Sequence, residues 1–261
     1  MDTATPLHPP QTKTVDAQPA SSRRPDPADR LIVALDFPSA DLALGLVDRL
    51  EGSCRWFKVG MELYYAAGNQ VLDQLRERGF DVFLDLKLHD IPNTVAGAVQ
   101  TVAGAGASLL TIHAGGGKAM MQAAAKAADR PGAPRLLAVT VLTSMDAAEL
   151  EAVGVAGDAG LVEPQVLRLA RLARAAGING LVCSPLEVAA VRKAMGPDAL
   201  LVVPGIRSAA AAGSDDQSRV ATAADAIAAG ASMLVVGRPI TQASDPAQAA
   251  TAILDQIPPA E

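Results

Sequence analysis

An acid and an amine stand close together in the stretch FLDLKLHDIPNTV, which covers residues 83–95. Asp85, Lys87 and Asp90 fall within six residues, and the apolar residues around the first two indicate a buried strand. Side chains alternate between the two faces of a strand, so Asp85 and Lys87 should point to the same face. Burying such charges costs desolvation free energy that an ordinary core avoids. The stretch therefore predicts a functional site that holds a carboxylate and an ammonium group side by side.

The short pattern D-x-K-x-x-D also has a simpler interpretation, in which charges at a strand end pair with one another and with solvent. Two further charges on other predicted strands favour a site instead. Asp36 ends the run LIVALD, and Lys58 lies inside WFKVG. Pro92 breaks the strand, because proline donates no backbone N–H and restricts the residue before it. Asp90 therefore lies just past the strand's end.

Short apolar runs alternate with alanine-rich amphipathic stretches from residue 31 onward, and this unit occurs eight times. The predicted strands cover residues 31–36, 55–60, 80–87, 108–114, 136–143, 180–184, 200–205 and 233–237. The predicted helices lie near residues 39–52, 61–78, 95–104, 118–128, 146–152, 164–176, 186–194, 221–229 and 246–256. Ser39 is a good N-cap for the first of these helices.

The repeated unit predicts an α/β protein with a (β/α)8 barrel. Apolar runs without polar alternation are typical of parallel strands covered by helices, and about 230 residues is within the usual size of such a barrel. A doubly wound open sheet is the alternative. It would more often carry a glycine-rich turn after its first strand, where this chain has Asp36-Phe37-Pro38.

In such barrels the active site lies at the carboxyl ends of the strands, and polar residues collect at those ends here. They are Asp36, Lys58, Asp85, Lys87, His113, Thr143, Ser144, Arg207 and Arg238, the last two in segments that begin with Pro204 and Gly237. Gly237-Arg238-Pro239 would suit a phosphate, because the loops after strands seven and eight are the usual phosphate site. The alternative for Arg238 is a pair with a nearby carboxylate.

Two loops need separate interpretation. Residues 208–218 have no packing pattern and predict a mobile lid, from which Gln217 could reach a ligand phosphate; a plain solvent loop is the alternative. The run HAGGGK (113–118) lacks the Ser or Thr of a phosphate loop at Ala119, so it predicts a strand-to-helix turn. His89 and His113 have no third ligand at zinc-like spacing, so we expect structural histidines and no metal site.

Composition excludes several classes of protein. The chain has 261 residues, 50% of them hydrophobic, and a net charge of −6 without a long basic run, which argues against nucleic acid as a partner. Cys54 and Cys183 are too few for a disulfide framework and indicate buried thiols in a reducing compartment. No window is long and apolar enough for a membrane span. We therefore expect a cytoplasmic protein.

Residues 1–29 differ from the rest of the chain. They carry six prolines among polar residues and almost nothing apolar to bury, which predicts a disordered tail. An Arg-Arg pair at residues 23 and 24 resembles the start of an export signal, but no apolar stretch follows it. The expected organisation is a tail over residues 1–29 and one barrel domain over residues 30–261.

Six segments together resemble the orotidine 5'-phosphate decarboxylase family of the bacterial type. They are ALD (34–36), KVG (58–60), FLDLKLHDIPNTV (83–95), VTVLTS (139–144), PGIR (204–207) and VVGRPIT (235–241). The resemblance covers residues 31–257 in the right order. It implies decarboxylation of orotidine 5'-phosphate to uridine 5'-phosphate and CO2, the last step of pyrimidine nucleotide synthesis. It also implies a homodimer that uses no cofactor and no metal.

The resemblance assigns roles to individual residues. Lys87 would be the general acid beside Asp85, and Asp36 and Lys58 would meet the ribose hydroxyls. Asp90, Ile91 and Thr94 would reach into the neighbouring subunit's site, where Asp90 would complete a charge network with Lys58, Asp85 and Lys87. The remaining contacts would be made by Thr143 and Ser144 to the pyrimidine, by Pro204 to the substrate, and by Arg207, Gln217, Gly237 and Arg238 to the phosphate end.

Two rival functions remain at this point. One is a Mg²⁺-dependent sugar-phosphate decarboxylase or aldolase on the same barrel, whose relatives also carry a D-x-K-x-x-D strand. The other is a catalytically silent phosphate-binding barrel with a partner-docking tail. Turnover of orotidine 5'-phosphate in the presence of EDTA would separate the resemblance from both.

Overall fold

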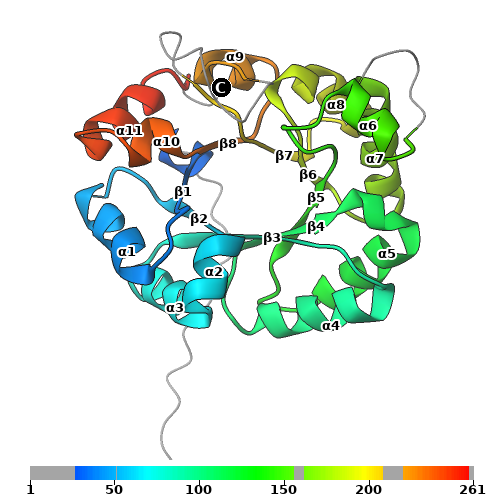
Figure 1. Cartoon of the computed structure of the whole chain (residues 1–261), viewed down its shortest axis with the longest axis horizontal. Coiled ribbons are helices and arrows are strands. Elements are labelled where there is room, and N and C mark those ends of the chain that lie inside the picture. Colours follow the sequence, from blue (N-terminus) through cyan, green and yellow to red (C-terminus); the bar gives the residue numbers. More distant parts are fainter. Residues whose placement is uncertain (1–26, 51, 156–161, 208–219, 259–261) are drawn as a thin grey trace, which may run out of the picture.

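Eight parallel strands close into a barrel in chain order, as the computed structural model shows (Figure 1). The structure describes residues 27–50, 52–155, 162–207 and 220–258. The strands are β1 (Leu31–Ala34), β2 (Trp56–Gly60), β3 (Asp81–Leu88), β4 (Leu109–His113), β5 (Arg135–Val139), β6 (Gly180–Val182), β7 (Leu200–Val203) and β8 (Met233–Val236). The predicted (β/α)8 barrel is confirmed.

Helices surround the barrel on its outside (Figure 1). The α-helices are α1 (Ala40–Arg49), α2 (Met61–Ala67), α3 (Asn69–Glu77), α4 (Pro92–Ala103), α5 (Gly117–Ala128), α6 (Ala147–Ala152), α7 (Glu163–Ala175), α8 (Val188–Met195), α9 (Ala223–Ala228), α10 (Arg238–Thr241) and α11 (Pro246–Leu254). Short 3-10 turns are η1 (Pro27–Arg30), η2 (Ala114–Gly116) and η3 (Pro185–Glu187). In the described ranges, no helix is both long and apolar enough to cross a bilayer.

Two helix ends can be explained by single residues of the sequence, an N-cap serine and a glycine. The side chain of Ser39 accepts a hydrogen bond from the backbone N–H of Leu42, so the predicted N-cap of α1 is confirmed. The prediction of a single helix over residues 61–78 is wrong. The segment forms two helices, because Gly68 has φ +60° and ends α2 in a backbone conformation that residues with a Cβ rarely adopt.

The last three residues of the predicted tail, residues 27–29, are described by the structure. Pro27–Arg30 form η1, which contacts the start of the barrel. Arg55 pairs with Asp29 at 2.7 Å, and Arg30 donates to the carbonyl of Ala231 at 3.0 Å. These contacts tie η1 to the amino-terminal side of the sheet. Residues 1–26, which make up the rest of the predicted tail, lie outside the described residues.

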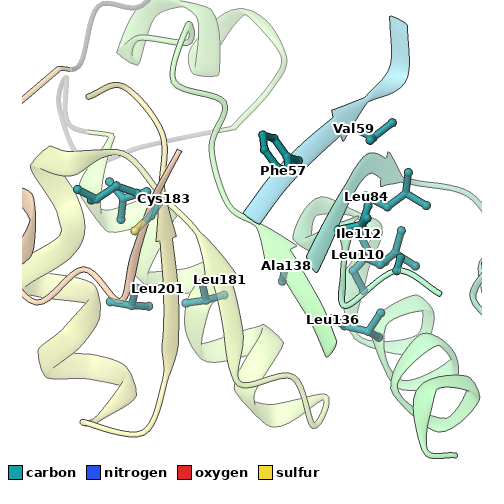
Figure 2. Packing of buried hydrophobic residues seen from close by; sticks show 14 of the residues in the cluster. Phe57, Val59, Leu84, Leu110, Ile112, Leu136, Ala138, Leu181, Cys183 and Leu201 are labelled. Carbon is teal, nitrogen blue, oxygen red and sulfur yellow. The ribbon is translucent and has the colours of Figure 1, made fainter. Parts of the chain in front are cut away.

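Alternation along the strands separates two apolar layers. One layer fills the barrel interior and consists of Ile32, Ala34, Phe83, Leu109, Leu137, Val202, Met233 and Val235. The larger layer lies between strands and helices, and Figure 2 shows part of it, with Leu84, Leu110 and Ile112 gathered from β3 and β4. Cys54 and Cys183 are buried thiols, as predicted. Since Leu110 and Ile112 face outward, Thr111 between them faces the interior.

The pairing of β3 with β4 changes register near the carboxyl ends. Leu84 pairs with Leu110, but Leu88 pairs with Ile112. The two pairs are therefore four residues apart on β3 and two residues apart on β4. Such an irregularity is a bulge, which re-aims side chains at barrel rims. Within the described ranges, Lys87 is the one residue other than glycine with a positive φ, at +48°. The strand is therefore distorted where its charged residues lie.

Gly180 gives a direct test of barrel packing. A Cβ at this position would lie 2.5 Å from the carbonyl oxygen of Leu136 and 2.7 Å from Cδ2 of Leu137. Because part of this clash is with backbone, Gly180→Ala should lower the free energy of unfolding by about 1–3 kcal/mol, the usual cost of overpacking. Urea denaturation followed by circular dichroism measures this free energy.

Gly45 in the middle of α1 is the matched control. A Cβ there meets nothing within 4 Å, so Gly45→Ala should raise the free energy of unfolding by about 0.5–1 kcal/mol through helix propensity. A Gly180→Ala variant as stable as the unmodified chain would contradict the packing of β6 on β5 described above.

Candidate active site

A cavity of about 530 Å³ opens at the carboxyl ends of the strands. The predicted site residues that line it are Asp36, Lys58, Asp85, Lys87, Thr143, Pro204, Arg207, Gly237 and Arg238. Apolar side chains of the barrel interior, among them Phe83, Val139 and Val235, form another part of the lining. The cavity thus combines charged groups with apolar surface, which is typical of a pocket for a small organic molecule.

Four charged side chains from the first three strands form an alternating chain. Lys87 Nζ lies 2.9 Å from both carboxylate oxygens of Asp85. Lys58 Nζ lies 2.7 Å from Asp36 Oδ1 and 3.7 Å from Asp85 Oδ2. Carboxylates and ammonium groups alternate along this chain, so each lysine lies beside at least one carboxylate. The expectation that Asp85 and Lys87 point the same way is confirmed.

The carboxylate of Asp85 is the most enclosed member of this chain. Burial alone would raise its pKa, but the charges of Lys58 and Lys87, together with hydrogen bonds from Lys87 and Thr111, outweigh burial and lower it. The group is therefore charged at neutral pH. Because the pKa in the folded state lies below the ordinary value of 3.8, this pairing stabilises the fold above that pH and is lost as the pH falls below it.

Neighbouring strands bring the charges together by register. Gly60 at the end of β2 pairs with Asp85 of β3, and Lys58 pairs with Phe83, so Lys58 enters the rim two residues below Asp85. A Cβ on Gly60 would lie 3.0 Å from Lys58 Nζ and 3.1 Å from Asp36 Oδ1. Glycine at this position leaves the space that the ion pair occupies. In the KVG segment, the lysine therefore supplies the positive charge and the glycine leaves room for the ion pair.

Thr111 belongs to the site although sequence reasoning missed it. Its hydroxyl accepts a hydrogen bond from the backbone N–H of Lys87 at 2.8 Å and donates one to Asp85 Oδ1 at 2.9 Å. The side chain is completely buried. The available signal was a hydroxyl inside the apolar run LLTI (109–112), at an inward position next to the strand that carries Asp85 and Lys87.

Residues 90–94, which we call the arm, do not reach the cavity of their own chain. All five are exposed, and Ile91 is 67% exposed although it is apolar. Asp90 Oδ1 accepts a hydrogen bond from the backbone N–H of Ile91 at 2.6 Å. Pro92 begins α4, so the arm consists of the end of the connection after β3 and the first turn of that helix. The geometry of a single chain therefore separates Asp90, Ile91 and Thr94 from the remaining site residues.

Three other predictions can be placed. Ser144 is exposed and does not line the cavity, whereas its neighbour Thr143 does. Gln217 and the predicted lid lie outside the described residues. The HAGGGK segment is the predicted strand-to-helix turn, since β4 passes through η2 into α5. Helix α10 begins at Arg238 itself, one residue after Gly237.

His89 and His113 form a stacked pair beside the charged strand. Their ring centroids lie 5.2 Å apart with an interplanar angle of 23°. Burial, with smaller effects from His89 and Lys87, lowers the pKa of His113, so its ring is neutral at neutral pH. Across the described ranges, no three His, Cys, Asp or Glu side chains gather closely enough to hold a metal ion.

Comparisons with known proteins agree with the geometry. The model of the "Orotidine 5'-phosphate decarboxylase / HUMPS family" matches residues 29–253. The orotidine 5'-phosphate decarboxylase of Anaeromyxobacter sp. (strain K) is 55% identical over 227 residues, which cover 87% of this chain and 97% of that protein. The enzyme of the same name from Halorhodospira halophila is 53% identical over 229 residues, covering 87% and 95%.

Solved structures give the same result. The crystal structure of orotidine 5'-phosphate decarboxylase from Lactobacillus acidophilus matches with a TM-score of 0.74 and 38% identity, covering 90% of this chain and 99% of that one. An uncharacterised conserved protein from Geobacillus kaustophilus matches with a TM-score of 0.74 and 36% identity, covering 87% and 99%. The family model and these relatives span nearly all of the barrel, and the chain therefore belongs to the orotidine 5'-phosphate decarboxylase / HUMPS family.

Proposed function

We propose that this chain decarboxylates orotidine 5'-phosphate to uridine 5'-phosphate and CO2, the last step of pyrimidine nucleotide synthesis, as a cytoplasmic lyase. The observation that carries the proposal is the ammonium group of Lys87, held 2.9 Å from both oxygens of Asp85 at the wall of a nucleotide-sized cavity. The names of the relatives that match over most of the chain support it. We expect the reaction to need neither cofactor nor metal.

The proposed reaction uses Lys87 as its acid. The bond between C6 of the pyrimidine and its carboxyl carbon breaks, CO2 leaves, and the electron pair stays at C6. A proton from Lys87 Nζ then forms the new C6–H bond. Asp85 pairs with this ammonium group and would lie beside the leaving carboxylate, so its charge opposes the bound substrate more than the product.

The sizes of the two effects indicate that fixed charges contribute more to the rate of decarboxylation than proton transfer does. Positioned general acid catalysis contributes about 10²- to 10⁴-fold, whereas difficult reactions need on the order of 20 kcal/mol of transition-state stabilisation. At an effective dielectric constant of 20, two unit charges 4 Å apart interact by about 4 kcal/mol. Several such interactions with fixed geometry, together with binding at groups remote from C6, supply the larger share.

The remaining lining residues suit the other parts of a nucleotide. We assign Asp36 and Lys58 to the ribose hydroxyls, because their ion pair lies at the rim between β1 and β2. Thr143, Ser144 and Pro204 are assigned to the pyrimidine. The phosphate end would fall to Arg207, Gln217, Gly237 and Arg238, of which Arg207 and Arg238 bring cations to the loops after β7 and β8.

A homodimer would give the arm a function. Ile91 exposes 67% of its surface on the arm, and Tyr65 exposes 77% on α2, the helix that follows the neighbouring strand β2. Exposed large apolar side chains of this kind favour an interface. We propose that the arm enters the partner's cavity, where Asp90 would become the next acid after Lys87 in the alternating chain.

The first test is the loss of the acid. Lys87→Ala should lower kcat by more than about 10⁴-fold, because it removes both the proton donor and the fixed cation. The measurement is the ultraviolet change on conversion of orotidine 5'-phosphate, with EDTA present throughout. Lys118→Ala removes an exposed lysine of α5 and should keep the kcat of the unmodified chain. Substantial turnover by Lys87→Ala would exclude Lys87 as the acid, and dependence on added Mg²⁺ would favour the sugar-phosphate rival.

The second test is subunit mixing. Lys87→Ala and Asp90→Ala chains should each be poorly active alone. In a mixed dimer, one of the two sites has both residues intact, so an equimolar mixture should recover about one quarter of the unmodified activity if exchange is random. Native mass spectrometry verifies the exchange. Verified mixed dimers without recovered activity would show that the arm is not shared between sites.

A further inference from the structure

The hydroxyl of Thr111 contacts both Asp85 and Lys87, the two charged residues near the carboxyl end of β3. It accepts from the backbone N–H of Lys87 at 2.8 Å and donates to Asp85 Oδ1 at 2.9 Å. The donor and acceptor lie 24 and 26 residues away in the sequence, on the neighbouring strand. The hydroxyl is completely buried, so no water competes for either hydrogen bond.

The backbone of Lys87 needs such a partner. The register of β3 against β4 shifts between Leu84 and Leu88, so no regular pair with β4 includes Lys87. Its φ of +48° belongs to the left-handed region, which lysine rarely adopts. A buried N–H left without an acceptor is costly. Thr111 Oγ1 supplies the acceptor and makes this distorted conformation compatible with burial.

The same hydroxyl also orients the carboxylate. A threonine hydroxyl has one hydrogen, and since its oxygen accepts from Lys87, that hydrogen can point toward Asp85 Oδ1. Asp85 Oδ1 then receives Thr111 and Lys87 Nζ, while Oδ2 faces Lys87 and Lys58. Rotation of the carboxylate would break one of these contacts. The orientation of Asp85 and the aim of the Lys87 side chain are thus set by one group.

We propose that Thr111 is a positioning residue for the reaction, which fixes the left-handed backbone of Lys87 and the plane of the Asp85 carboxylate through one hydroxyl. This inference rests on the proposed function, because it concerns the aim of the acid that the function requires. Thr111 itself does not line the cavity, so it acts through Lys87 and Asp85 and need not touch substrate.

The test compares one substitution that removes the hydroxyl with one that keeps it. Thr111→Val keeps the shape and removes the hydroxyl, and it should lower kcat by about 10- to 100-fold, the effect of one hydrogen bond to a charged group. The KM for orotidine 5'-phosphate and the Kd for uridine 5'-phosphate should change less than about threefold, since the groups assigned to ribose and phosphate are untouched. Thr111→Ser restores the hydroxyl and should recover kcat to within about threefold of the unmodified chain.

Thr140 supplies the matched control. It is 3% exposed and lies just after β5, and its hydroxyl donates to the backbone carbonyl of Val182 at 3.0 Å, away from the charged chain. Thr140→Val should lose stability in thermal unfolding, as Thr111→Val does, and keep its kcat. If Thr111→Val does not fold, Thr111→Ala carries the same expectation for kcat without a second methyl group to accommodate.

Three outcomes would overturn the inference. They are an unchanged kcat in a folded Thr111→Val or Thr111→Ala variant, a Thr111→Ser variant as slow as Thr111→Val, and an equal loss of kcat in Thr140→Val. The unmodified chain is measured in the same series. If it does not turn over orotidine 5'-phosphate, the proposed function fails as well; if it does, any of the three outcomes removes only the role of Thr111.

Discussion

The site depends on one buried carboxylate that two lysines keep charged. Asp85 is 8% exposed, and burial by itself would favour its neutral form. Lys58 and Lys87 reverse that preference from two adjacent strands. A buried carboxylate of this kind is stabilised only while both cations stay in place, since removing one partner leaves an uncompensated charge. The pairing of β2 with β3 meets this requirement, because it brings Lys58 Nζ to within 3.7 Å of Asp85 Oδ2.

The barrel satisfies the requirement because of how its layers are filled. Inward positions below the rim carry apolar side chains such as Phe83, two residues before Asp85 on the same strand. The charged groups lie above this layer, at the carboxyl ends, where the cavity opens. Apolar neighbours limit the water that could screen the ion pairs, so their interactions are stronger than at an open surface. The same fold that buries the core therefore also strengthens the site.

Much of this arrangement could be predicted from single residues and their spacing. Uninterrupted apolar runs indicate parallel strands, and strand ends of a barrel share one rim, so Asp36, Lys58, Asp85 and Lys87 could be placed together without coordinates. Gly68 was not recognised as a helix break, because an isolated glycine within an amphipathic pattern is also tolerated inside helices. Local signals determined the strands well and the helix boundaries less well.

What could not be predicted depends on contacts between distant residues. Alternation correctly placed Asp85 and Lys87 on one side, but it assumes a regular strand, whereas the actual strand has a register shift and a left-handed Lys87. The contacts of Thr111 with Asp85 and Lys87 can be recognised only once β4 is placed beside the distorted part of β3. The arm is a different case: it does not line the cavity of its own chain, and the shared site that the resemblance implies needs a second molecule, which no pattern in one sequence can position.

The charge balance of the site explains why the two ends of the cavity differ. On the proposed function, the alternating chain already matches two lysines with two carboxylates, so a substrate carboxylate beside Asp85 enters a region with no excess cation. Its repulsion disappears when CO2 leaves, which favours the transition state over the bound substrate. The free energy that holds the substrate against this repulsion must come from groups far from C6. On the same proposal, Arg207 and Arg238, which line the cavity after β7 and β8, would supply it through the phosphate. Phosphate binding and the reaction at C6 are thus assigned to different strands, which the rigid barrel holds in a fixed relation.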